Sequence, residues 1–260
     1  VENHLLDLWA IFDFLAPGFL GKLTDFQKNY VKPIEDGDGK ALESLQVRVR
    51  PFVMRRKKED VASELPAKTE QTLFVQFGRT QLGLYNRILK AAKNEITGRI
   101  EEVGIEKSQM TILAALTRLR QVACDPRLLG LPEGTPVPPS AKLEAFKELM
   151  ADCVGSGRKV LVFSQFVEMQ KLLGEVLDEL GIPYLWLHGG TKNREEMVAQ
   201  FQHPSGPPVF LISLKAGGSG LTLTEADTVV HYDPWWNPAV EDQATDRAHR
   251  IGQDKPVMVY

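Results

Sequence analysis

The feature that most constrains the fold is an alternation of short apolar runs with helical stripes after residue 140. Runs that are typical of strands occur at 160–163, 184–187, 209–212 and 228–232. Between them, apolar residues recur at helical spacing, as in the stripe over 169–180 that Gly181 ends. The run at 160–163 is continuously apolar, which is typical of a strand covered on both faces. The pattern therefore predicts an α/β fold, with a parallel sheet and helices on both of its faces.

The part of the chain before this alternation is predicted to be largely helical. Residues 5–15 carry an apolar stripe, and a polar turn at 35–39 precedes another helix. Residues 80–125 carry two further stripes, the second of which Asp125 and Pro126 end. A strand is predicted at 73–77. Residues 130–140 hold four prolines and two glycines, which indicates a linker, and Ser140 can cap the helix that follows.

Composition excludes several classes of protein. The chain has 260 residues, of which 43% are hydrophobic and 25% charged, as in ordinary globular proteins. Its formal net charge of -3 gives no sign of a nucleic-acid partner, so such a contact must come from local patches. Cys124 and Cys153 are the only cysteines, which argues against a cysteine-rich metal site and indicates a reducing compartment. No run of 18 apolar residues predicts a membrane span.

Two further features concern the ends and the charge pattern. The sequence begins without methionine and ends inside a strand-like run, so we expect an excised fragment of a longer protein. A basic cluster is either a solvated charge run or a segment that faces phosphate or bridges two lobes. Its members are Arg48, Arg50, Arg55, Arg56, Lys57 and Lys58.

Polar residues and glycines gather after the predicted strands, where parallel sheets bind their ligands. These segments are 164–166, 188–192, 213–220 and 233–238. The glycines at 217–220 either form a tight turn or let backbone N–H groups approach an anion. Lys215 either contacts phosphate or is an exposed surface lysine. Trp235 and Trp236 cannot easily both point inward, so one of them stacks on a base, a sugar or a partner, or else plugs the core.

The segment 241–253 carries Arg247 and Arg250, which on a helix share one face with Gln243. Two permanently charged planar cations suit a polyphosphate, and such an arginine stabilises charge on a transferring γ-phosphate. The alternative is a solvated helix face paired with the acidic residues of the same segment. No Gly-x-x-x-x-Gly-Lys-Ser/Thr loop and no Asp-Glu-x-His string occurs in the sequence. A chain with such arginines but without a phosphate loop is predicted to be half of a two-lobed motor.

Several strings resemble the C-terminal helicase-like lobe of the Swi/Snf-type ATPases, the DNA-translocase branch of helicase superfamily two. They are 213–224, Asp-Pro-Trp-Trp-Asn-Pro at 233–238 and Asp-Gln-Ala-Thr-Asp-Arg-Ala-His-Arg-Ile-Gly-Gln at 242–253. The resemblance extends to 159–166 and 187–191, and at the front to 1–17 and 50–61. Thr222 departs from the asparagine that is usual in the family, and a shortened spacing leaves Arg194 without an assigned role.

The resemblance implies a RecA-like fold for 140–260 and three segments in the chain. Residues 1–69 correspond to the end of the N-terminal lobe, a helical segment and the crossing between lobes. Residues 70–139 correspond to the start of the C-terminal lobe, with a helical insertion and a proline-rich linker, and 140–260 to its RecA-like body. ATP with Mg²⁺ is expected between the lobes, and double-stranded DNA on another face.

The resemblance also implies roles for individual residues. Arg247 and Arg250 correspond to arginine fingers, and Gln243 and Gly220 to residues near the nucleotide. The residues that correspond to DNA-backbone or DNA-proximal positions are Ser164, Gln165, Gly190, Thr191, Lys215 and Trp235. No metal ligand is expected in this chain.

The resulting hypothesis is the C-terminal motor lobe of an ATP-dependent double-stranded DNA translocase or remodeller, inactive without its N-terminal lobe. Its expected partners are double-stranded DNA, that lobe and DNA-bound protein complexes, inside the cell on a bacterial nucleoid or in a nucleus and not on a membrane. The alternative is a helicase-like fold that acts as a non-catalytic DNA- or protein-interaction module. The net charge favours this alternative, whereas intact Arg247, Arg250 and Gln243 oppose it. A strand-separating helicase is a nearer alternative, against which only the resemblance of 233–238 argues.

Overall fold

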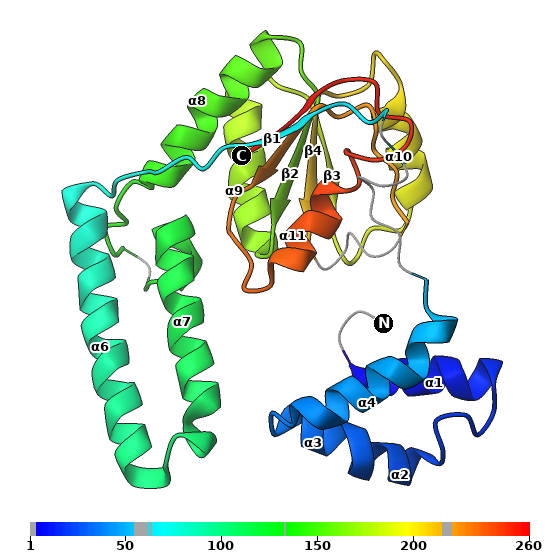
Figure 1. The fold of residues 1–260 in the computed structure, drawn as a ribbon. Helices are drawn as coiled ribbons and strands as arrows, with labels where there is room; N and C mark the ends of the chain where they lie inside the picture. The colour runs from blue at the N-terminus through cyan, green and yellow to red at the C-terminus, as the bar shows by residue number, and fades with distance from the viewer. Residues whose placement is uncertain (1–3, 55–61, 63, 133, 215–219) are drawn as a thin grey trace. The chain divides into compact units, whose positions relative to one another are not determined.

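A computed structural model describes residues 4–54, 62, 64–132, 134–214 and 220–260 (Figure 1). Its contacts divide the chain into two compact units, Val1–Ser63 and Glu64–Tyr260. The boundary predicted after residue 69 falls inside a strand of the second unit, which begins earlier. The segments 70–139 and 140–260 both belong to this second unit.

The first unit is helical around a small aromatic and aliphatic core. Its elements are α1 (Leu5–Leu15), α2 (Leu23–Phe26), a π-helical turn η1 (Gln27–Val31), α3 (Lys32–Glu35), α4 (Gly39–Val49) and η2 (Arg50–Phe52). Asp38 begins α4, because its Oδ1 accepts the Lys40 backbone N–H at 2.9 Å. Phe12, Leu20, Phe26 and Leu45 are buried at the centre. The helices predicted at 5–15 and after the polar turn are thus confirmed.

The second unit contains a six-stranded sheet in which every pairing is parallel. The strands are β1 (Lys68–Glu70), β2 (Val160–Ser164), β3 (Tyr184–Leu187), β4 (Val209–Ser213), β5 (Thr228–His231) and β6 (Val257–Val259). Their order across the sheet is β1-β6-β5-β2-β4-β3, so β2 lies between β5 and β4. The predicted strands from 160 to 232 are confirmed almost to the residue.

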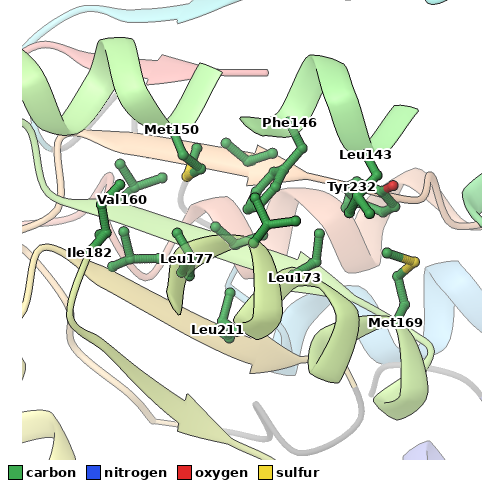
Figure 2. Packing of buried hydrophobic residues seen from close by; sticks show 14 of the residues in the cluster. Leu143, Phe146, Met150, Val160, Met169, Leu173, Leu177, Ile182, Leu211 and Tyr232 are labelled. Atoms are coloured by element: carbon green, nitrogen blue, oxygen red, sulfur yellow. The ribbon is translucent and has the colours of Figure 1, made fainter. Parts of the chain in front are cut away.

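Helices cover both faces of this sheet, as the alternation predicts. The helices are α8 (Ala141–Gly155), α9 (Val167–Glu179), α10 (Arg194–Gln202) and α11 (Pro238–Thr245). Val160 and Val162 of β2 pack with α8 and α9, a cluster shown in Figure 2. Leu161 and Phe163, one residue out of phase, pack with α10 and α11 on the other face. Gly181, with φ +66°, ends the turn after α9 as expected.

A helical hairpin precedes α8 in the same unit. It consists of α6 (Arg79–Val103), η3 (Glu106–Ser108), α7 (Gln109–Cys124) and η4 (Pro126–Leu129), with α6 and α7 side by side in Figure 1. Buried Gln81 of α6 donates to the Val122 carbonyl at 3.0 Å and accepts the Ala141 N–H at 3.1 Å. Ser140 caps α8 as predicted, accepting the Leu143 N–H at 3.3 Å. One glutamine thus ties α6, α7 and the start of α8 together.

The strand predicted at 73–77 is wrong, and the strand in this region is β1. Lys68 pairs with Val257 and Glu70 with Val259, at the edge of the sheet. The sequence Lys-Thr-Glu has no apolar pattern, and all three residues are exposed, so only the bonds with β6 make it a strand. Phe74, in the apolar run that suggested a strand, is 93% exposed.

Candidate functional site

The carboxyl ends of the central strands meet through short polar contacts. The Gln165 N–H, just after β2, donates to Asp233 Oδ2, just after β5, at 3.1 Å. The Leu214 N–H, after β4, donates to the Ser164 carbonyl at 3.1 Å. Ser164 itself is buried, and its hydroxyl contacts the backbone of Phe166. The predicted residues Ser164 and Gln165 therefore sit at the junction of three strand ends.

The loop after β3 is held by its own residues. The Thr191 hydroxyl oxygen accepts the His188 N–H at 3.0 Å, and His188 Nδ1 accepts the Gly190 N–H at 3.2 Å. Gly190 is exposed, and a Cβ at this position would lie 3.2 Å from the His188 ring. The hydroxyl proton of Thr191 remains able to donate outward, because the oxygen is the acceptor in its bond to His188.

Arg120 of α7 reaches the loop after β5, a contact that sequence analysis missed. Its Nη1 donates to Gln165 Oε1 at 3.2 Å, its Nη2 donates to the Pro234 carbonyl, and Nη2 lies 3.9 Å from Asp233 Oδ2. Its guanidinium carbon also lies 5.5 Å from the ring centre of Trp235 and 4.8 Å from that of Trp236. The sequence offered no signal for this, because the bonded partners are 45 and 114 residues away.

Asp233 is the buried acid of this junction. Burial raises its pKa to about 6, against the lowering effect of its hydrogen bonds and of Lys142 and Arg120. The adjacent tryptophans are not both buried, as predicted, since Trp235 is half-buried and Trp236 is 57% exposed. The Trp235 N–H donates to a carboxylate oxygen of Glu241 at 2.6 Å.

The helix predicted to carry Arg247 and Arg250 ends before both of them. α11 stops at Thr245, and residues 246–252 form turns. Gln253 stabilises these turns, because its buried amide donates to the carbonyls of Thr224, Ala226 and Ala248 at 2.9, 2.8 and 3.1 Å. Tertiary hydrogen bonds thus replace the continuation of the helix.

The two arginines have different surroundings. Arg247 is 8% exposed, with its guanidinium carbon 5.6 Å from the ring centre of Phe163. Within the described residues its Nη1 has no hydrogen-bond partner, and burial lowers its pKa to about 10. Arg250 is half-buried, and its Nη1 donates to the Leu221 carbonyl at 3.5 Å. The two arginines therefore do not share one face of a helix, contrary to the prediction, and their roles stay predictions.

The remaining predicted residues lie around this segment or outside the description. Gln243 is exposed on α11. Gly220 is exposed, with φ +100°, a conformation that favours glycine. Lys215 and four members of the basic cluster, Arg55 to Lys58, lie outside the described residues.

The described residues include no group of three or more His, Cys, Asp or Glu side chains that could hold a metal ion. None of the described helices is both long and apolar enough to cross a bilayer. A cavity of about 260 Å³ beside α8 is lined by Lys142, His231, Tyr232 and Glu241 among others, and no predicted site residue contributes to it.

Two sequence families match the chain in succession. The SNF2-related domain matches residues 1–128, and the helicase conserved C-terminal domain matches residues 141–252. A putative ATP-dependent helicase/translocase of Bacillus subtilis is 42% identical over 268 residues, covering 100% of this chain and 28% of the relative. The human SWI/SNF-related regulator of chromatin subfamily A member 1 is 34% identical, covering 100% of this chain and 26% of the relative. The chain thus spans about a quarter of the length of these two relatives.

Solved structures match as well. The Sulfolobus solfataricus SWI2/SNF2 ATPase core in complex with double-stranded DNA is 35% identical, with a TM-score of 0.62, covering 99% of this chain and 54% of that one. The C-terminal domain of the Sulfolobus solfataricus SWI2/SNF2 ATPase is 30% identical, with a TM-score of 0.58, covering 74% of this chain and 77% of that one. The chain therefore belongs to the SWI2/SNF2 family of helicase-like ATPases, and its parallel sheet is a RecA-like fold of that family.

Proposed function

We propose that this chain is the C-terminal motor part of an ATP-dependent translocase or remodeller that acts on double-stranded DNA. Its relatives include proteins described as ATP-dependent helicases, and a similar solved core is described in complex with double-stranded DNA. In this proposal ATP is held by an N-terminal lobe of the same protein, and this chain completes the site when the lobes close.

The observation that carries the proposal is the buried guanidinium of Arg247. Burial of a cation without a full set of partners is unfavourable, and an arriving anion offsets that cost. The unpartnered Nη1 therefore fits a phosphate group of ATP better than a purely structural role. Because the guanidinium retains its proton at neutral pH, it can stabilise the negative charge of a transferring γ-phosphate.

Arg250, Gln243 and Gly220 complete the nucleotide side of the proposal. Arg250 lies half-buried beside the loop that contains Leu221, and its remaining N–H groups can donate to phosphate oxygens. ATP normally binds with Mg²⁺, which keeps waters and phosphate oxygens as ligands. The described residues offer no acidic cluster for it, so the proposal assigns its protein ligands to the N-terminal lobe.

The DNA side of the proposal uses the strand-end loops. Thr191 can donate its hydroxyl proton to a backbone phosphate, and exposed Gly190 allows close approach. Half-buried Trp235 offers an aromatic ring, and Lys215 would add a cation. Buried Ser164 holds the Phe166 N–H, and half-buried Gln165 joins the loop after β2 to Asp233 in the loop after β5. A protein that moves on duplex DNA works inside the cell, on a nucleoid or in a nucleus, where DNA-bound protein complexes are its candidate targets.

The test is ATP hydrolysis by the full-length protein with and without duplex DNA. Arg250→Ala is expected to lower DNA-stimulated turnover by on the order of 10³–10⁵ while DNA binding persists. Arg118→Ala, on an exposed face of α7, is the matched control and should retain wild-type turnover. Wild-type turnover in Arg250→Ala would refute the finger role. DNA binding by a wild-type protein that shows no hydrolysis would favour the non-catalytic module instead, and the purified 1–260 chain should not hydrolyse ATP.

A further inference from the structure

A single side chain from the helical hairpin contacts both loops at the centre of the sheet. Arg120 of α7 donates to the Gln165 side chain after β2 and to the Pro234 carbonyl after β5. It also lies 3.9 Å from Asp233 Oδ2, and that same oxygen accepts the Gln165 N–H. Arg120 therefore joins three elements that are separate in sequence.

The same guanidinium orients the two tryptophans. Its carbon lies 4.8 Å from the ring centre of Trp236 and 5.5 Å from that of Trp235. Trp236 is 57% exposed, so neighbouring apolar packing alone does not fix its ring. A cation over the ring face supplies the missing orientation. The loop is held at a second place, where the backbone N–H of Trp235 donates to the Glu241 carboxylate.

Only arginine meets these demands together. Its planar fork of donors can serve an amide oxygen, a carbonyl and a carboxylate while its faces lie against aromatic rings. A lysine keeps the charge, but its single ammonium cannot hold those directions at once. The Arg120 side chain is 19% exposed, so its charge is only weakly screened where it meets Asp233.

We infer that Arg120 is a positioning residue, which holds the loops 164–166 and 233–236 in the arrangement that contacts DNA. This inference rests on the proposed function, because it assigns those loops to DNA. It gives the α6–α7 hairpin a role beyond packing. The hairpin fixes the surface that the sheet presents to its ligand, through one side chain near the end of α7.

The experiment compares Arg120→Lys with Arg118→Lys in the full-length protein. Arg120→Lys is expected to raise the duplex-DNA concentration for half-maximal ATPase stimulation roughly tenfold, with near-wild-type turnover at saturating DNA. Its tryptophan emission, without DNA, should become more accessible to acrylamide. Arg118→Lys, from the exposed face of the same helix, should change neither quantity.

A second variant keeps the inference testable if Arg120→Lys does not fold. Trp236→Leu removes the exposed ring over the guanidinium and should shift half-saturation in the same direction, and adding Arg120→Lys to it should have less than the additive effect. Unchanged half-saturation and unchanged quenching in Arg120→Lys would overturn the inference, as would strictly additive effects. A wild-type protein without DNA-stimulated hydrolysis would instead refute the proposed function, whereas the quenching comparison would still test the contact between Arg120 and the loop.

Discussion

Two arginines of the second unit, Arg120 and Arg247, meet aromatic rings near the carboxyl ends of the strands, but their surroundings differ. Arg120 has an amide oxygen, a carbonyl, a carboxylate and two indole rings around it. Arg247 has the ring of Phe163, and its Nη1 has no hydrogen-bond partner among the described residues. Both terminal nitrogens of Arg120 thus have a hydrogen-bond acceptor, whereas Nη1 of Arg247 has none, although Asp233 Oδ1 and Gln165 Nε2 beside Arg120 also lack a partner among the described residues.

The difference separates a structural from a binding or catalytic role for a buried arginine. A buried cation with a full set of partners stabilises the elements that supply them, and its removal leaves those partners unsatisfied. A buried cation that lacks partners lowers stability until an anion arrives, so it fits a binding or catalytic role better than a structural one. Two substitutions and a pH series can break or sharpen this comparison.

The largest effect is expected from Arg247→Met. Turnover of the full-length protein should fall by at least on the order of 10³, because the charge that faces the phosphate is lost. Stability should stay level or rise, since an apolar side chain of similar length replaces an incompletely paired cation. Steady-state hydrolysis and thermal melting give the two readings. A clear fall in melting temperature would place Arg247 in the same structural class as Arg120.

The opposite pattern is expected from Arg120→Met. The free energy of unfolding should fall by about 3 kcal/mol, because Asp233 and the Pro234 carbonyl lose a charged partner. Because the Arg120 side chain is 19% exposed, the expected loss of stability is smaller than for a fully buried ion pair. Turnover at saturating DNA should fall far less than in Arg247→Met. Urea unfolding followed by circular dichroism measures the change, with Arg118→Met expected within about 0.5 kcal/mol of wild type. Equal stability in the two variants would contradict the comparison.

The smallest effect is a pH dependence at Asp233. Its pKa in the folded state, about 6, lies above the ordinary value of 3.8, so the folded protein binds this proton more tightly than the unfolded chain. Its contribution to stability is therefore fully present below pH 3.8 and is lost as the pH rises through about 6. Relative to Asp233→Asn, which does not titrate, wild type should lose on the order of 2–3 kcal/mol between pH 4 and pH 7. Urea unfolding at each pH measures this, and a constant difference between the two proteins would contradict it.

Much of the fold follows from local patterns. The strands β2 to β5, the stripe of α9 and the hairpin helices were predicted because each is specified by the periodicity of residues that are neighbours in sequence. The cap at Ser140 was predicted for the same reason, since its partner Leu143 is three residues away. The segments that bear the candidate site were also predicted, because parallel strands place their carboxyl ends at one edge.

What the sequence by itself determined is the order of the elements, the faces of the strands and the segments that carry candidate ligand-binding residues. The tertiary structure decided that Lys68–Glu70 is a strand, that α11 stops at Thr245 and that Arg120 reaches the loop after β5. Each of these depends on hydrogen bonds between residues far apart in the chain, as with β1 and β6 or Arg120 and Pro234. Helical and strand periodicity is a property of neighbouring residues, and it carries no information about such distant partners.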